Sequence, residues 1–520
     1  MSLDTTTGAA LLLLDEAERI VGAAHVRRPG DDGFAERYGD PYTFADGFAT
    51  AAAGAVLPAS VDEVQRIVRA AGRVGASLWT VSRGRNLGYG GAAPHDPSSV
   101  VLDLGRMNAV RAVDPDLCYA VVEPGVSFFQ LHEHLRAMDA PLWTSVPDLG
   151  HGSVLGNALE RGFGYTAYGE HGQFLCGMEV VLPDGEIVRT GMAAVTDSST
   201  AHLYKGGFGP SLDGLFQQSN LGVVTSVGVW LMPRPQTAAA CLLHVPGPGQ
   251  LAELVDTVRP LMLDGTIDSV AIVGNALAIA SQLMPRAAVS DDPAPLSDER
   301  IAQVAERIGI GWWNAKFGLY GAQEVVEAKL EVVRRAAARI GATVDVRVHP
   351  GDVDPAAVHP ADRAQLGIPS GDLIRMAAWR GGEPAHTDFS LVAPTTGAEA
   401  QRLVELVAPV VRDAGFDHAG GFTMFGRHAV MLTLLAFDRS DADERRRIDD
   451  LFERLIAVSA AAGFVPYRSH LRFMDRIAGL YDFNDGAARR LVTRIKRTLD
   501  PGDVLSPGKQ GIRAAPDPAG

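Results

Sequence analysis

Hydrophobic residues recur at intervals of three and four positions after residue 60, which is the spacing of one face of an α-helix. Ser60 precedes this run and Glu63 follows it by three residues, a pair typical of a capping box at a helix N-terminus. The apolar positions are Val61, Val64, Ile67, Val68 and Ala71. The short apolar segment 77–81 comes next and predicts a strand. The pattern therefore predicts a helix followed by a strand.

Strand-like and helix-like runs continue to alternate in the first half of the chain. Segments 99–104 and 119–122 predict strands, and the amphipathic run 128–138 predicts a helix. Asp184-Gly185 separates two strand-like runs and predicts a hairpin. The strand-like run 222–235 then ends in two prolines. This alternation predicts α/β layering, with a domain boundary after residue 235.

The remainder of the chain has a different pattern, with fewer glycine loops. The amphipathic runs 297–309 and 322–341 predict helices, and the runs 342–349 and 429–437 predict strands of an antiparallel sheet. The end of the chain returns to the glycine and proline content of the first half, and we expect it to pack there. The predicted fold class is α+β, and the predicted divisions are 1–235, 236–463 and a returning C-terminal segment, 464–520.

The charge of the 520-residue chain narrows the classes of partner. Its formal net charge is −15, which argues against nucleic acid and against anionic membrane surfaces, because both need a cationic protein surface. No run of 18 or more apolar residues occurs, and the apolar run 9–14 lacks the basic start of a secretory signal. We therefore expect a cytoplasmic protein with neither nucleic acid nor membrane as a partner.

The cysteines give no framework for a disulfide or metal site. Cys118, Cys176 and Cys241 are odd in number, far apart and outside any Cys-x-x-Cys pair. A reducing compartment and the absence of a structural zinc site are the expected consequences.

Three glycine-rich loops, 84–91, 150–156 and 207–214, lie in the first half. None fits the Gly-x-Gly-x-x-Gly fingerprint of a Rossmann dinucleotide site, which argues against a nicotinamide cofactor. Exposed backbone N–H groups at glycines can still bind a phosphate-bearing cofactor without a fixed motif. The alternative is that each loop is only a tight turn that needs positive φ.

Longer blocks of sequence carry a family likeness. Those of the first half are GRNLGYGGAAP (84–94), VVEPGVSFFQLH (121–132), PDLGHGSVLGNALERGFGYTAYGEH (147–171), GMEVVLPDGEIVRTGM (177–192) and FQQSNLGVVTSVGVWLMP (216–233). YRSHLRFMD (467–475) and DPGDVLSPGKQGI (500–512) follow near the C-terminus. Together they resemble the vanillyl-alcohol oxidase / 4-cresol dehydrogenase flavoprotein family, closest to its eugenol oxidase and bacterial 4-alkylphenol oxidase members. The resemblance implies an FAD-binding domain of two α/β subdomains and a cap domain whose large antiparallel sheet, flanked by helices, covers the flavin ring.

Oxidation of para-substituted phenols is the reaction that the resemblance implies. The phenol must become a phenolate to release hydride from its benzylic carbon to flavin N5, although a free phenol has a pKa of about 10. Hydroxyl donors and a guanidinium in a dry pocket can stabilise that anion. Tyr89, Tyr467 and Arg468 match the family's phenolate-binding residues.

Asp148 matches an acidic residue that the family places near flavin N5 and the reacting carbon. Loss of hydride leaves a para-quinone methide, and a carboxylate there can take a proton from attacking water or from an alcohol hydroxyl. Without the resemblance, an aspartate after Pro147 is typical of a turn.

His386 lies where the family's oxidases attach FAD covalently through histidine, whereas its cresol dehydrogenases use a tyrosine at a different position. Some members have histidines at the positions of Tyr42-Thr43, so attachment is expected to need another group here or to be incomplete. His151 and Asp388 are more polar than expected, and no role is assigned to them; Glu170-His171 is interpreted as structural. The other residues expected at the FAD are Arg85, Asn86, Gly88, Gly90, Gly152, Ser153, Gly156, Asn157, Gly164, Tyr165, Gly222, Val224 and Lys509.

The expected function is an FAD-dependent oxidase of para-substituted phenols such as vanillyl alcohol, eugenol and 4-alkylguaiacols, with oxygen reduced to hydrogen peroxide. One alternative is a dehydrogenase that passes electrons to a cytochrome; the histidine attachment pattern favours the oxidase. Another is an FAD enzyme of hydroxy acids or sugars, which would not need the phenolate-binding residues, and a third is a flavin protein without activity. A homodimer or larger homo-oligomer is expected.

Overall fold

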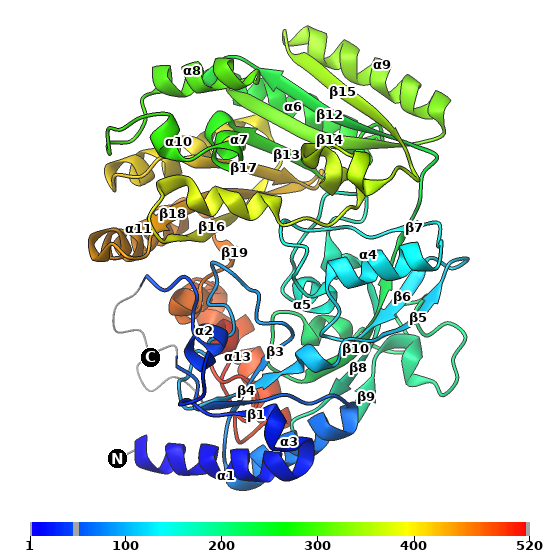
Figure 1. Cartoon of the computed structure of the whole chain (residues 1–520), viewed down its shortest axis with the longest axis vertical. Coiled ribbons are helices and arrows are strands. Elements are labelled where there is room, and N and C mark those ends of the chain that lie inside the picture. Colours follow the sequence, from blue (N-terminus) through cyan, green and yellow to red (C-terminus); the bar gives the residue numbers. More distant parts are fainter. Residues whose placement is uncertain (1–2, 45–50, 516–520) are drawn as a thin grey trace.

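The computed structural model describes residues 3–44 and 51–515, which form two bodies stacked along the long axis of the molecule (Figure 1). The first body contains the N-terminal elements and the C-terminal helices, and the second body contains the middle of the chain. The first and the last described segments of the chain therefore lie in the same body. No helix within the described ranges is long and apolar enough to cross a membrane.

A four-stranded sheet near the N-terminus carries the helix predicted after residue 60. Its order is β1 (Val26–Arg27), β2 (Gly54–Val56), β4 (Val100–Asp103) and β3 (Leu78–Val81). Strands β2, β4 and β3 are parallel, and α1 (Leu3–Val21) and α3 (Val61–Val74) share a buried apolar cluster with them. The Ser60 side chain accepts a hydrogen bond from the Glu63 N–H, so the predicted helix start is confirmed. The short α2 (Phe34–Tyr38) follows α1.

A five-stranded antiparallel sheet forms the second layer of this body. Its order is β5 (Val110–Asp114), β6 (Tyr119–Val122), β10 (Val223–Trp230), β8 (Leu175–Val181) and β9 (Ile187–Arg189). The helices α4 (Phe128–Ala137) and α5 (Val154–Leu159) pack against it, and β7 (Leu142–Trp143) pairs with β11 (Met232–Pro233) at its side. The hairpin at Asp184-Gly185 is confirmed, because β8 and β9 pair across it and Gly185 has φ +81°.

The second body is built on one eight-stranded sheet in which every neighbouring pair is antiparallel. Its order is β15 (Thr343–Pro350), β12 (Thr237–Val245), β14 (Trp313–Gly321), β13 (Ala271–Asn275), β17 (Ala419–Met424), β18 (His428–Asp438), β16 (Pro384–Pro394) and β19 (Pro466–Arg468). The helices are α6 (Leu251–Leu263), α7 (Ala276–Leu283), α8 (Asp298–Ile308), α9 (Gln323–Arg339), α10 (Gly397–Asp413) and α11 (Ala442–Ala461). The predicted large antiparallel sheet and the two predicted helices are confirmed.

The C-terminal segment connects the two bodies. β19 pairs with β16 of the eight-stranded sheet, although the sequence placed it in the returning segment. After β19 the chain enters the first body, where it forms α12 (Met474–Ala478) and α13 (Phe483–Leu499) (Figure 1). There Leu78 of β3 donates its N–H to the carbonyl of Val504 over 2.7 Å and accepts from Ser506 over 2.6 Å.

Candidate active site

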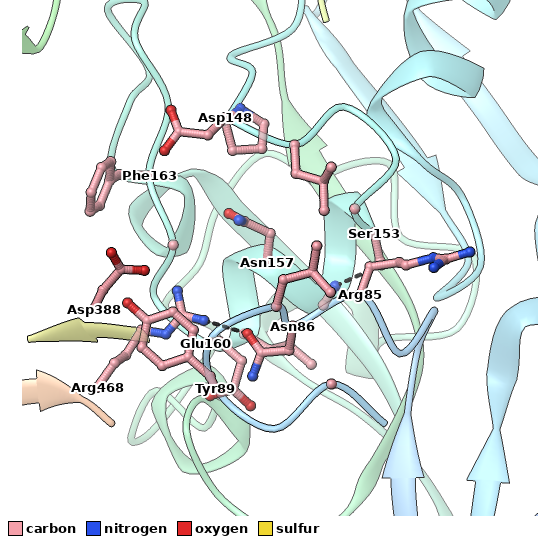
Figure 2. A pocket seen from close by; sticks show the side chains of 18 of the residues that line it. Arg85, Asn86, Tyr89, Asp148, Ser153, Asn157, Glu160, Phe163, Asp388 and Arg468 are labelled. Carbon is pink, nitrogen blue, oxygen red and sulfur yellow. Dashed lines mark hydrogen bonds between the residues drawn. The ribbon is translucent and has the colours of Figure 1, made fainter. Parts of the chain in front are cut away.

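A cavity of about 420 Å³ lies between the two bodies (Figure 2). Its walls come from the loop after β3, the residues around α5, the segment before β10, the C-terminal loop and the strands β13, β16, β17, β18 and β19. The predicted residues that line it are Arg85, Asn86, Tyr89, Asp148, Gly152, Ser153, Gly156, Asn157, Tyr165, Gly222, Val224, His386, Tyr467, Arg468 and Lys509. The fold thus brings all four candidate catalytic residues and His386 to one cavity.

Tyr89 and Arg468 are in direct contact on one wall. The Arg468 Cζ lies 4.1 Å from the centroid of the Tyr89 ring, and its Nη2 donates to Asn86 Oδ1 over 2.6 Å. The Tyr89 hydroxyl lies 3.4 Å from the hydroxyl of Ser390, which is paired with Arg468 across β16 and β19. This pairing explains why a loop from the first half and an edge strand of the other body meet here.

Both tyrosines of this wall remain protonated donors. Burial raises the pKa of Tyr89 well above its ordinary value, and the nearby charge of Asp388 adds to the effect. Burial also raises the pKa of Tyr467, although Arg468 opposes it. Burial acts to lower the pKa of Arg468, but Tyr89 and Tyr467 outweigh it and raise that pKa. The wall therefore offers two hydroxyl donors and one fixed cation, which suits a bound oxyanion.

Asp148 occupies a different part of the cavity from Tyr89 and Arg468, beyond Phe163 (Figure 2). Its carboxylate accepts a hydrogen bond from the Tyr165 hydroxyl. Burial raises the pKa of Asp148 to about 6; the Tyr165 hydrogen bond opposes this rise and the charge of Asp388 adds to it. A carboxylate with a pKa in this range can exchange a proton near neutral pH, as general acid–base chemistry requires.

His386 is buried on β16, with its Nε2 3.5 Å from Asp388 Oδ2. Its ring centroid is 5.1 Å from that of Tyr42, and a Cβ added to Gly88 would lie 3.0 Å from its Nε2. Its Nδ1 is buried and has no hydrogen-bond partner in the described part of the chain. Burial lowers the pKa of His386, so the imidazole is held neutral and nucleophilic.

Three of the predicted cofactor residues do not line the cavity: Gly88, Gly90 and Gly164. Gly90 has φ +104°, and a Cβ there would lie 2.4 Å from Leu471 Cδ1. A Cβ on Gly164 would lie 2.5 Å from the Ser145 hydroxyl. These glycines allow protein segments to pack closely behind the cavity wall.

Lys509 forms a partly buried ion pair with Glu160, at 2.6 Å between Nζ and Oε1. Burial opposes ionisation of Glu160, but Lys509 and Arg468 lower its pKa and keep it charged. The sequence interpretation missed Glu160, although it lies inside the quoted block 147–171.

The Ser153 hydroxyl accepts a hydrogen bond from the Gly156 N–H and donates one to the Pro124 carbonyl, so it fixes the start of α5.

The cavity fits an extended dinucleotide such as FAD. It reaches from Trp79 of β3 and Leu505 in the first body to Phe422 of β17 in the eight-stranded sheet. Along the first-body part, glycine, serine and asparagine residues leave backbone groups accessible, as a phosphate-bearing group needs. His386, with an unpartnered ring nitrogen, lies at the other end. The Asn157 Oδ1 lies 2.6 Å from His171 Nδ1.

Comparisons with known proteins agree with this geometry. Residues 52–191 match the FAD binding domain family, and residues 316–510 match the C-terminal domain of FAD linked oxidases. The chain is 36% identical to the 4-cresol dehydrogenase [hydroxylating] flavoprotein subunit of Pseudomonas putida, over 89% of this chain and 88% of that protein. It is 30% identical to the 1'-carboxy-chondrochloren decarboxylase of Chondromyces crocatus, over 96% and 97% of the two chains.

Two solved structures have the same fold over nearly the whole chain. Substrate-bound p-cresol methylhydroxylase superposes with a TM-score of 0.92 at 32% identity, covering 98% of both chains. The isoeugenol complex of 4-ethylphenol oxidase from Gulosibacter chungangensis superposes with a TM-score of 0.91 at 33% identity, covering 99% of this chain and 98% of that one.

Proposed function

The chain belongs to the vanillyl-alcohol oxidase / 4-cresol dehydrogenase family of FAD-dependent oxidoreductases, and we propose that within it the protein is an oxidase of para-substituted phenols. The observation that carries the proposal is the meeting of Tyr89, Tyr467 and Arg468 on one wall of the cavity. A hydroxy acid or a sugar would not need two buried hydroxyl donors and a guanidinium placed for a phenolate oxygen.

The bound FAD would supply the hydride acceptor, and the chain's own residues would prepare the substrate. Arg468 and the two tyrosine hydroxyls would hold the phenolate oxygen, which favours hydride loss from the benzylic carbon. Asp148 would take a proton from water attacking the resulting para-quinone methide, or from the hydroxyl of a benzylic alcohol. Vanillyl alcohol, eugenol and 4-alkylguaiacols are the proposed substrates.

We propose that FAD is attached covalently through His386, and that Gly152, Gly156, Asn157, Gly222, Val224, Lys509 and the loop residues Arg85 and Asn86 surround it. The unpartnered Nδ1 and lowered pKa of His386 support this assignment. The ring centroid of Tyr42, at a position where the resemblance implies a histidine in some family members, lies 5.1 Å from that of His386. Asp388, 3.5 Å from Nε2, is the acidic group nearest this ring among those described.

The electron acceptor is the point on which two of these relatives differ. One is named as a dehydrogenase subunit, and the other is named as an oxidase. We propose oxygen as the acceptor, with hydrogen peroxide as the product, and a homodimer or larger homo-oligomer in the cytoplasm. The alternative is transfer of electrons to a cytochrome or another acceptor, which similarity to the dehydrogenase subunit favours.

An aerobic assay of the purified holoenzyme with vanillyl alcohol and 4-propylguaiacol tests this function. Peroxide and oxidised product should accumulate in equal amounts. Product that forms only with an added artificial electron acceptor would replace the oxidase by a dehydrogenase. No turnover of any para-substituted phenol under either condition would contradict the proposed substrate class.

A further inference from the structure

Asp388 is a cavity carboxylate to which the reaction described above gives no role in handling the substrate. Its side chain is 21% exposed and lies in the cavity wall (Figure 2). It is on the same face of β16 as His386, which is two residues earlier. Within residues 3–44 and 51–515, no hydrogen bond satisfies its carboxylate, and its ion contact is the 3.5 Å approach to His386. A largely buried carboxylate with free acceptor capacity is suited to a donor on a bound molecule.

Asp388 lies close to the wall that is proposed to bind the phenolate oxygen. It is within electrostatic reach of all three proposed phenolate-binding groups: its charge raises the pKa of Tyr89 and of Tyr467, and Arg468 acts on its own pKa. Figure 2 draws it between Phe163 and the Tyr89 ring, with Asp148 beyond Phe163. Asp148, moreover, already accepts the Tyr165 hydroxyl.

A phenol that binds as its anion must give up a proton, and the phenolate-binding wall cannot take it. Arg468 keeps its own proton, since its pKa is raised. Tyr89 and Tyr467 are protonated donors whose own ionisation is suppressed by burial. Glu160 is also within electrostatic reach of Arg468, but it is paired with Lys509, and a ring nitrogen of His386 is the proposed site of flavin attachment. Among the described residues, Asp388 is therefore the carboxylate near this wall that accepts no hydrogen bond.

We propose that Asp388 accepts the proton of the phenol hydroxyl when the substrate binds. The phenol O–H bond breaks, the proton passes to a carboxylate oxygen of Asp388, and the electron pair stays on the phenolate oxygen beside Arg468. One negative charge thereby moves from Asp388 to the ligand, so the buried site gains no net charge. An ionised Asp388 beside a phenolate would instead place two anions together, which a low-dielectric site opposes. This inference rests on the proposed function.

The pH dependence of proton acceptance by Asp388 is set by the titratable groups that face it. His386 shares its strand, Tyr467 and Arg468 lie on neighbouring β19, and Tyr89 lies in the loop after β3. Asp148 and Tyr165, which donates to it, complete the set among the described residues. Burial raises the pKa of Asp388, and His386 and Arg468 oppose that rise. Proton acceptance needs the ionised carboxylate, so substrate binding should weaken as acid protonates Asp388.

The test is the ionisation state of a bound phenol in the holoenzyme and in Asp388→Asn. The probe is 4-hydroxybenzaldehyde, whose phenolate absorbs at longer wavelength than its phenol. It is added at a pH below its own pKa, so that the free probe is mostly the neutral phenol. We expect the wild type to bind the phenolate form without releasing a proton to the buffer. Asp388→Asn should bind the neutral phenol, or bind the phenolate with release of a proton, and its kcat/KM for 4-propylguaiacol should fall by about 100-fold.

Two further variants separate the possible explanations. Asp388→Glu should restore ligand ionisation in part, and Asp345→Asn, a partly exposed carboxylate paired with His244, should behave as wild type. Circular dichroism and the flavin spectrum check that Asp388→Asn folds and keeps its cofactor. Unchanged ligand ionisation, proton release and pH profile in Asp388→Asn would overturn the role of Asp388 while wild-type turnover upholds the proposed function. A wild type that turns over no para-substituted phenol would instead refute the function itself.

Discussion

The guanidinium of Arg468 lies over the ring of Tyr89, with its Cζ 4.1 Å from the ring centroid. The two residues come from different bodies of the molecule. Because one face of the guanidinium is used by the ring, its N–H edge remains for Asn86 and for a ligand oxygen. The stacking thus orients the cation as well as holding it.

Replacement of that guanidinium by an ammonium should impair catalysis. Arg468→Lys keeps the positive charge but loses the planar stack and the fixed donor geometry. We expect kcat/KM for 4-propylguaiacol to fall by about 10²–10³-fold, as for loss of a preorganised oxyanion contact. Arg73→Lys, in an exposed pair with Glu16, is the matched control and should leave kcat/KM unchanged. A fall of less than threefold in Arg468→Lys would contradict the phenolate assignment.

Asp148→Asn should remove a pH dependence of turnover. Burial raises the pKa of Asp148 to about 6, so the carboxylate that accepts the proton from water predominates only above that pH. We expect the rate of hydroxylated product formation in the wild type to rise as the pH increases through about 6. The same rise should be absent in Asp148→Asn. Rates measured across the range from acid to mildly alkaline pH check it, and an identical profile in both proteins would refute the role.

The same substitution should change stability in a pH-dependent way. The folded protein binds the Asp148 proton more tightly than the unfolded chain does, because its folded pKa is raised. The stability it contributes is present at low pH and is lost as pH rises through about 6. The melting temperature of Asp148→Asn relative to wild type should therefore be higher at pH 8 than at pH 4. The opposite trend would show that the Tyr165 hydrogen bond outweighs burial.

His386→Ala should abolish covalent flavin attachment. Acid precipitation of the wild type should leave the flavin with the protein, and precipitation of His386→Ala should release it into the supernatant. His428→Ala, whose side chain is 41% exposed beside Glu170, provides the control and should retain bound flavin. Flavin that stays with precipitated His386→Ala would place the attachment at another residue.

Lys496→Met should destabilise the C-terminal segment strongly. The Lys496 Nζ is buried, 2.7 Å from Asp500 Oδ2, and it also donates to the carbonyls of Asn220 and Leu505. Its loss would leave the Asp500 carboxylate buried without its cation, at a cost of about 3–5 kcal/mol. Urea unfolding measures the change. Arg66→Met breaks an exposed pair with Asp62 and should cost no more than about 0.5 kcal/mol; an equal effect of the two substitutions would contradict the argument.

Elements whose local signals agree with their burial could be predicted from the sequence. Helix α3 has both an N-terminal cap at Ser60 and an αL glycine at Gly75, and its apolar stripe is the side that is buried. The same holds for α8, which the Ser297 side chain caps and Gly309 ends. These signals come from residues within one or two turns, so no knowledge of the rest of the fold is needed.

Features that depend on which surfaces meet could not be predicted. A lysine such as Lys496 in an amphipathic run is normally solvated, and only the packing of α13 on the first body buries it. The strand pattern around Asp388 likewise does not reveal that its face of β16 borders a cavity. Family resemblance named Gly88 and Gly90 as cofactor residues, whereas their close contacts with His386 and Leu471 arise from tertiary packing.

Strand β19 reaches the cavity from the edge of the eight-stranded sheet, while Tyr89 and Asp148 come from the first body. A ribosome makes the chain from its N-terminus, so most of both bodies can form before Arg468 emerges. A nascent chain therefore holds most of the cavity wall while its anion site is still incomplete. The phenolate-binding wall is thus completed only once β19 has been made, after every other strand of the eight-stranded sheet.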